Sequence, residues 1–166
     1  MKTLCMLAGL LLSAPVLADP ADQFDFWLGH WKLTWPQPDG THASGDNLIT
    51  EILDERIILE AFDGRPAMNL VGRSFTAYDT NEQRWKQTWV DNQGGYLDFV
   101  GGLEADGRMI LARQFSKDGK TVHQRMVWFN ISADSFDWHW ESSVDGGETW
   151  TVLWPIHYQR RQDVDD

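Results

Sequence analysis

Short runs of β-branched and aromatic residues, separated by turn residues, make up most of the chain. Within these runs apolar and polar side chains alternate, which is the period of a β-strand with two different faces. Helical spacing is visible only over residues 21–28, where Asp19 stands at the N-cap position and Pro20 in the first turn. The pattern predicts an all-β protein with about ten strands and one short N-terminal helix. The expected strands are residues 29–35, 42–53, 56–62, 69–78, 85–91, 96–102, 109–115, 122–130, 136–142 and 149–160.

Tight turns connect these expected strands. Residues 38–40 read Pro-Asp-Gly, residues 117–119 Lys-Asp-Gly and residues 145–147 Asp-Gly-Gly. Glycine accepts a positive φ in such turns, and aspartate caps them. Strands joined by short hairpins form an antiparallel up-and-down meander, and closure into a β-barrel removes its exposed edges. We therefore expect a barrel. A β-sandwich is the alternative, but it needs long crossovers, for which there are few candidates.

Several strand faces mix tryptophan with polar side chains. Residues 85, 87, 89 and 91 place Trp, Gln, Trp and Asp on one face, and residues 136, 138 and 140 place Phe, Trp and Trp on another. A dry core is built mainly from Leu, Ile and Val, whereas a ligand cavity is lined by rings and a few polar groups. We expect such a cavity; a volume above about 300 Å³ would support a ligand, and a filled barrel would not. A packed core with its polar groups at the barrel ends is the alternative.

Composition and charge restrict the partners. The chain is 42% hydrophobic, contains ten Trp and carries a formal net charge of −11. It can therefore build a core, and its acidity argues against binding to nucleic acid or anionic lipid, because both need clustered Lys and Arg.

The N-terminus has the features of a secretory signal peptide. Lys2 precedes an apolar run over residues 4–12, and small residues lead to Ala18. We expect cleavage after Ala18 and export to the periplasm or out of the cell. The run is too short to span a bilayer, so no membrane insertion is expected. Cleavage removes the only cysteine. The expected barrel domain is residues 19–161, followed by a disordered tail at 162–166.

Three segments carry a resemblance to a known class of proteins. Residues 24–31 read Phe-Asp-Phe-Trp-Leu-Gly-His-Trp, residues 85–92 read Trp-Lys-Gln-Thr-Trp-Val-Asp-Asn, and Tyr158-x-Arg160 lies near the end. Together they resemble an uncharacterised bacterial family of secreted, lipocalin-like barrels of the calycin superfamily. The resemblance covers nearly all of residues 19–166. It implies that Gly29, Trp31 and Arg160 are structural, with Trp31 closing one barrel end and the Arg160 guanidinium lying across its ring.

The histidines suggest two further possibilities. Nitrobindins, haem-binding members of the wider barrel class, use a histidine near the C-terminus, where this chain has His157. However, His157 lies on the strand face opposite to that of Tyr158 and Arg160. It is therefore expected to point outward if Arg160 points inward. Asp137, His139 and Glu141 share one strand face and could hold a metal, but an exposed charged face explains them as well. We expect no cofactor and no metal.

Asp91 is the best candidate for catalysis. It follows Trp85 and Trp89 on one face, and indole rings around a carboxylate would raise its pKa by desolvation. It also precedes the turn at residues 92–95 and could simply cap it. Residues 143–150 match the Asp-box hairpin of sialidases, but a propeller needs one copy per blade and the chain has one. We expect this segment to be a local hairpin.

These observations favour an exported barrel that binds a small apolar or aromatic molecule in a Trp-lined interior. The expected ligand-binding residues are Gln87, Trp89, Asp91, Trp138, Trp140 and Tyr158. A cofactor-free isomerase, cyclase or hydrolase and a haem-binding barrel are the alternatives, and a carbohydrate that stacks on indole rings also fits. The sequence does not indicate the oligomeric state.

Overall fold

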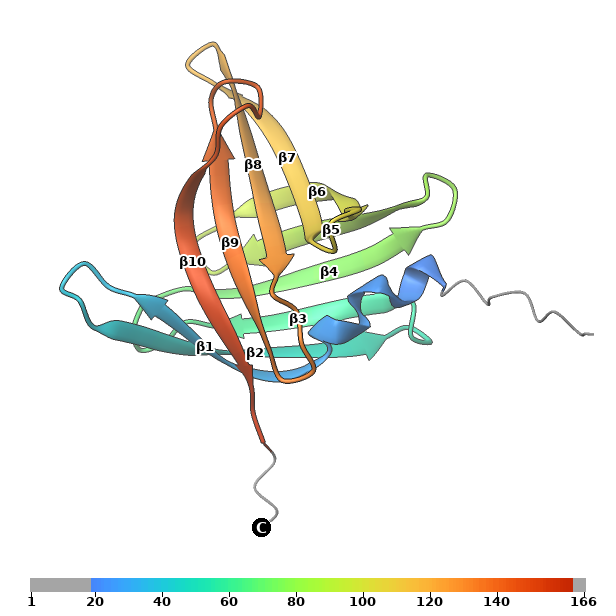
Figure 1. The fold of residues 1–166 in the computed structure, drawn as a ribbon, viewed down its shortest axis with the longest axis horizontal. Helices are drawn as coiled ribbons and strands as arrows, with labels where there is room; N and C mark the ends of the chain where they lie inside the picture. The colour runs from blue at the N-terminus through green and yellow to red at the C-terminus, as the bar shows by residue number, and fades with distance from the viewer. Residues whose placement is uncertain (1–18, 163–166) are drawn as a thin grey trace, which may run out of the picture.

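A computed structural model describes residues 19–162 and shows a closed antiparallel barrel (Figure 1). Each strand pairs with its neighbours in the chain, and β1 also pairs with β10, so that no sheet edge is left open. The expected all-β barrel of ten strands is confirmed. The predicted signal peptide (1–18) and residues 163–166 of the predicted tail lie outside the described residues. The strands are β1 Gly29–Pro36, β2 His42–Ile52, β3 Ile57–Asp63, β4 Val71–Asp79, β5 Arg84–Asp91, β6 Tyr96–Leu103, β7 Met109–Lys117, β8 Lys120–Phe129, β9 Ser135–Ser143 and β10 Thr151–Arg160.

The expected helix is the 3₁₀-helix η1 (Pro20–Trp27), drawn in blue in Figure 1. The Asp19 carboxylate accepts a hydrogen bond from the Ala21 N–H at 2.9 Å, as an N-cap should. Phe24 is fully buried, and its ring contacts those of Trp85 and Trp128 edge-on at 4.9 and 5.3 Å. Because these two residues lie at the start of β5 and the end of β8, η1 covers the barrel end where those strand ends meet.

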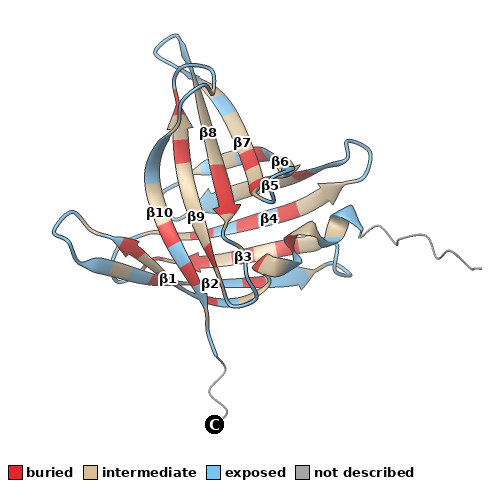
Figure 2. Cartoon of the chain, in the orientation of Figure 1, coloured by how far each residue is buried: buried red, intermediate tan, exposed pale blue. Residues whose placement is uncertain are grey.

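Burial alternates along the strands, as a barrel interior requires (Figure 2). On β3 the buried side chains are Ile58, Glu60 and Phe62, separated by partly exposed ones. Within the described part of the chain, no helix is long and apolar enough to cross a membrane.

Most of the expected strand ends differ from the observed ones by one or two residues, among them those at Leu53, at residues 69–70 and at residues 149–150. Leu53 has a positive φ of 54° and so ends β2 at Ile52. Residues 69 and 70 belong to the connection before β4, which begins at Val71. Residues 149 and 150 precede β10, because Asp145 accepts the Thr149 N–H at 3.0 Å and Gly147 O accepts the Trp150 indole N–H at 3.0 Å.

The last strand also departs from simple alternation. A bulge between Val152 and Trp154 shifts the register against β9, so that Val152 lies opposite Glu141 and Trp154 opposite Trp140. Val152 is 43% exposed, whereas Trp154 packs against the core. Strict alternation would place Val152 and Trp154 on the same face, and the extra residue of the bulge reverses the pleat between them.

The hairpin at residues 143–150 is held together by its own polar groups. The Ser143 hydroxyl donates to Asp145 at 2.7 Å and accepts from the Gly147 N–H at 2.9 Å. The Trp150 ring lies under the Arg125 guanidinium, 3.9 Å from the ring centroid. These contacts account for the Asp-box pattern as a local structure.

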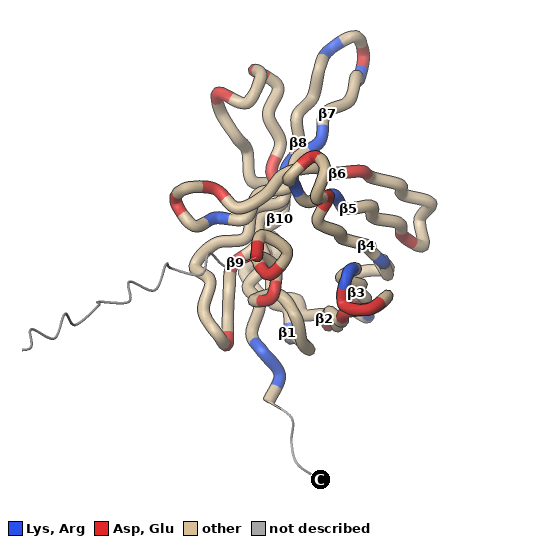
Figure 3. The backbone as a smooth tube through the Cα atoms, turned by 90° about the vertical axis from the view of Figure 1, so that its right-hand side faces the viewer, with Lys and Arg blue, Asp and Glu red and all other residues tan. Residues whose placement is uncertain are grey.

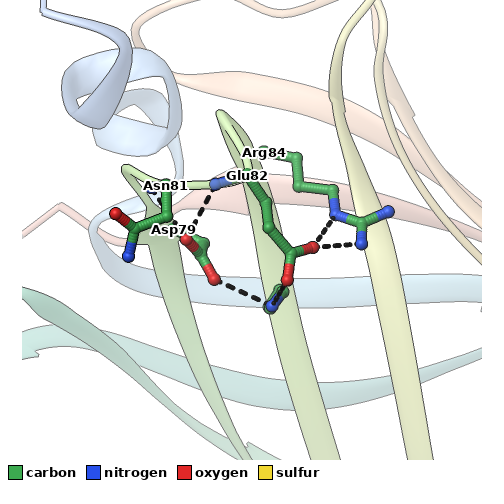
Figure 4. A network of polar contacts seen from close by, with 5 residues as sticks. Asp79, Asn81, Glu82 and Arg84 are labelled. Carbon is green, nitrogen blue, oxygen red and sulfur yellow. Dashed lines mark hydrogen bonds and ion pairs between the residues drawn. The ribbon is translucent and has the colours of Figure 1, made fainter.

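A second turn, between β4 and β5, is fixed by charge (Figure 4). Asp79 caps the turn by accepting the backbone N–H groups of Asn81 and Glu82 at 2.9 and 3.0 Å. Lys86 bridges Asp79 and Glu82 at 2.8 Å each, and Arg84 pairs with Glu82. The Lys86 ammonium and the turn N–H groups lower the pKa of Asp79 to about 2.

Candidate functional site

A cavity of about 230 Å³ lies inside the barrel. Its walls are aromatic on most sides, and its few polar groups come from two carboxylates and one phenol. The volume is below the threshold of about 300 Å³ set above for a ligand cavity, so the space suits a molecule the size of a substituted benzene rather than a larger ligand. The lining residues are Trp27, Glu60, Phe62, Leu70, Trp89, Asp91, Leu97, Phe99, Met126, Trp128, Trp138, Trp140, Trp154, Ile156 and Tyr158.

The aromatic walls are locked against each other edge-to-face. Trp138 and Trp154 meet at 5.9 Å with an interplanar angle of 90°, and Phe99 and Trp140 at 5.7 Å and 82°. Such edge-on pairs restrict the rings to a few orientations. The cavity is therefore formed before any ligand arrives.

Three of the lining tryptophans keep their indole N–H groups away from the cavity. The Nε1 atoms of Trp27, Trp128 and Trp154 are buried and have no hydrogen-bond partner in the described structure. Trp27 and Trp128 meet edge-on, with ring centroids 5.5 Å apart and an interplanar angle of 70°. These three residues therefore offer the cavity carbon surface rather than donors.

Glu60 is the most unusual residue of the site. Its side chain is only 7% exposed and lies on β3 between the buried positions Ile58 and Phe62. Asn47 Nδ2 donates to its Oε1 at 2.7 Å, and the Ser74 hydroxyl donates to its Oε2 at 2.7 Å. No Lys or Arg of residues 19–162 forms an ion pair with it. The carboxyl group is thus buried with neutral partners alone.

Burial raises the pKa of Glu60, because the charged form loses its hydration; the hydrogen bonds from Ser74 and Asn47 and the more distant Arg73 oppose this shift. Tyr158 belongs to the same group, since Asn47 Nδ2 lies 3.3 Å from its phenol oxygen. Burial, reinforced by the negative charge of Glu60, raises the pKa of Tyr158. A carboxyl group and a phenol, both with a raised pKa, therefore meet at the cavity wall.

Asp91 lines the cavity, but its electrostatics are the reverse of the expectation. Trp89 Nε1 donates to Asp91 Oδ2 at 3.0 Å, and the N–H groups of Gln93 and Gly95 donate to Oδ1 at 2.9 Å each. These donors lower its pKa. The proposed raised pKa is therefore wrong, because Asp91 caps the turn after β5, where partial exposure leaves the desolvation effect smaller than the hydrogen bonding.

The other expected ligand-binding residues divide into two groups. Trp89, Trp138, Trp140 and Tyr158 line the cavity beside Asp91. Gln87 is buried on the interior face but does not line it, because its amide donates to the Thr76 hydroxyl at 2.7 Å within the barrel wall.

The closed end shows the arrangement expected of Gly29, Trp31 and Arg160. The Arg160 guanidinium lies 4.1 Å from the centroid of the fully buried Trp31 ring and donates to Leu28 O at 2.8 Å. Gly29 has a φ of 124°, and a Cβ there would overlap Arg160 Nη1. Only glycine accommodates both constraints.

The histidine alternatives lack a suitable geometry. His157 lies on the outer face, half exposed, and its Nδ1 is 2.8 Å from Asp137 Oδ1, so it cannot reach a group inside the cavity. Glu141 accepts from Arg125 at 2.6 Å and lies 3.2 Å from His139 Nδ1. Over residues 19–162 no cluster of three or more His, Cys, Asp or Glu is arranged to hold a metal.

Sequence reasoning missed Glu60 and its partner Asn47. The signal was present: Glu60 is the one charged residue in the run Ile57-Ile58-Leu59-Glu60-Ala61-Phe62. A charge inside an apolar strand points to a paired or functional group. Trp128 and Trp154, which alternation alone leaves between core and cavity, line the cavity.

A comparison with known protein families identifies the family of the chain. A family described as "Protein of unknown function (DUF1579)" matches residues 23–160. The chain belongs to this family. The match spans residues 23–27 of η1 and all ten strands, so the DUF1579 region is the barrel with most of the helix that covers its end as a lid. None of the curated proteins compared with the chain matches it. The DUF1579 description names no activity, and the function has to be inferred from the cavity.

Proposed function

We propose that this DUF1579 protein binds a small apolar or aromatic molecule inside its barrel. The observation that carries the proposal is the preformed cavity of about 230 Å³, walled by tryptophan and phenylalanine rings. Apolar cavities somewhat smaller than this, about 150 Å³, hold benzene. Burying the surface of a molecule of that size contributes about 25 cal/mol per Å² to binding, and rigid walls lower the entropic cost.

The proposal is tested by titrating the protein with 4-nitrotoluene, a small neutral aromatic that quenches tryptophan fluorescence. We expect saturable, one-to-one quenching, because Trp89, Trp138, Trp140 and Trp154 line the cavity. N-acetyltryptophanamide is the control for collisional quenching, because its quenching increases linearly with the concentration of 4-nitrotoluene. Quenching of the protein that is equally linear would reject the proposal.

A filling variant locates the binding inside the barrel. Met126 lines the cavity and is 8% exposed, so Met126→Trp puts an indole into the space. Val90 is exposed on the outer face of β5, so Val90→Trp adds the same group outside. We expect saturable quenching to be lost in Met126→Trp and kept in Val90→Trp. Retention in both would place the binding elsewhere.

We also propose that the protein is exported and binds its ligand outside the cytoplasm. The support is the signal-like sequence of residues 1–18, and the test is mass spectrometry of the exported protein. A mature chain beginning at Asp19 is expected, and an intact N-terminus in the cytoplasmic fraction would contradict it.

Catalysis without a cofactor is the second candidate, with Glu60 in place of Asp91. A buried carboxyl group whose pKa is raised matches the needs of a general acid or base near neutral pH. The probe is 5-nitrobenzisoxazole, which opens when a base removes its ring proton and the N–O bond breaks. Faster opening by the wild type than by Glu60→Gln would support this role, and equal rates would exclude it.

A further inference from the structure

The cavity wall contains two carboxyl groups and no positively charged side chain. Glu60 and Asp91 are the acidic side chains that line it, and no Lys or Arg does so. We propose that the molecule bound there is a small organic cation, an aromatic or branched apolar group bearing an ammonium, whose charge faces Glu60 and Asp91. This inference rests on the proposed function and names the ligand class.

Glu60 supplies the first argument. A buried carboxylate is stable when a cation compensates it, and Glu60 has only the neutral donors Asn47 and Ser74. The positive charge of Arg73 acts on Glu60 without an ion pair, and its guanidinium donates to Gly72 O at 2.7 Å. An ammonium group of a ligand in the cavity would give the Glu60 carboxylate the positively charged partner that it lacks.

The rings supply the second argument. Trp89, Trp138, Trp140 and Trp154 surround the cavity, and the faces of indole rings carry negative electrostatic potential that attracts cations. Several aromatic walls together with a carboxylate form the environment that binds alkylated ammonium groups. A neutral apolar ligand would use the same surface but leave the carboxylates without partners.

Asp91 and the surrounding surface supply the third argument. Asp91 accepts three hydrogen bonds from neutral donors and keeps its negative charge where the strand ends. Acidic residues also occupy many loops of the barrel, as Figure 3 shows, and the chain has a net charge of −11. Such a field raises the local concentration of cations and repels anions.

A second guanidinium, that of Arg113, lies beside Phe99 of the cavity wall, and its Nη1 is buried with no hydrogen-bond partner in the described structure. Arg113 stacks on Phe115 and Phe99, 4.8 and 5.9 Å from the ring centroids, and it does not line the cavity. An anionic ligand would therefore meet Glu60 and Asp91 without a cation to balance its charge.

The test uses two molecules of nearly the same shape, phenyltrimethylammonium and tert-butylbenzene, as competitors against 4-nitrotoluene. They differ in charge because nitrogen replaces carbon. We expect the cation to compete at about tenfold lower concentration, the factor that one favourable cation–π or charge contact supplies. Equal competition, or a preference for tert-butylbenzene, would overturn the cation proposal and leave the proposed function standing. If neither molecule competes and 4-nitrotoluene does not bind, both proposals fail.

Two variants separate the cavity charge from the overall charge. Glu60→Gln and Asp91→Asn each remove one ionisable carboxyl group from the cavity wall, and we expect each to reduce the preference for the cation several-fold. Asp98→Asn removes the same charge from the outer face of β6, where Asp98 is exposed and accepts from the Thr88 hydroxyl. In this control the preference for the cation over tert-butylbenzene should stay within about twofold of that of the wild type. Equal losses in all three variants would contradict binding of the charge inside the barrel.

Discussion

Glu60→Gln should stabilise the protein at neutral pH. The folded-state pKa of Glu60 is raised by burial, while the unfolded chain has the ordinary value of about 4.3. Below that value both states are protonated and there is no penalty. As the pH rises, the unfolded state ionises first, so stability falls until the pH passes the folded-state pKa. Each unit between the two pKa values costs about 1.4 kcal/mol.

The glutamine is well suited to the same place. Its amide oxygen can accept the Asn47 N–H, and its NH₂ group can donate to the Ser74 hydroxyl, which rotates to accept. The variant therefore removes the ionisation without leaving a buried group unpaired. For a chain of this size 1 kcal/mol corresponds to about 3 °C in Tm.

The assay is urea unfolding of both proteins from pH 4 to pH 8, with the difference in free energy of unfolding plotted against pH. Subtraction removes the titration of the other carboxylates. We expect the advantage of Glu60→Gln to be small at pH 4 and to grow by about 1.4 kcal/mol per unit of pKa shift. Glu141 is the matched control, since it is equally buried but paired with Arg125 at 2.6 Å. Glu141→Gln should lower stability. A difference for Glu60→Gln that does not change with pH would refute the reasoning.

Three further substitutions test the lid and the walls. Gly29→Ala should lower the free energy of unfolding by about 2–4 kcal/mol in urea unfolding, because of its φ of 124° and the displaced Arg160 guanidinium; a loss below 0.5 kcal/mol would contradict this. Phe24→Ala should cost about 3–5 kcal/mol, since the ring is fully buried in the lid, and an unchanged denaturation midpoint would show that η1 is not part of the core. Gly72→Ala should weaken 4-nitrotoluene binding, because the new Cβ would overlap the Trp89 ring and push it into the cavity; unaltered quenching would remove Trp89 from the wall.

The architecture was predictable because local signals agreed. Alternation gave the strands, Gly and Asp marked the turns, and Asp19 marked the start of η1. The bulge at Val152 was not predictable, since alternation continues through it in the sequence. It depends on the pairing of β10 with β9, which is a property of the whole sheet.

The site was predictable only in its aromatic part. Trp89, Trp138 and Trp140 were found because strand alternation places them on interior faces. The raised pKa expected for Asp91 was wrong and Glu60 was missed, since a pKa depends on burial and donors that a sequence does not display. Asp91 has three donors and stays charged, whereas Glu60 is buried with two neutral partners.

The central claim, that the barrel holds a small aromatic molecule, is tested most directly by crystals grown with bromobenzene. The account predicts an anomalous bromine peak inside the barrel, bounded by Trp89, Trp138 and Trp154, at the cavity of about 230 Å³. Side chains that fill this space, or bromine found only on the outer surface, would contradict it.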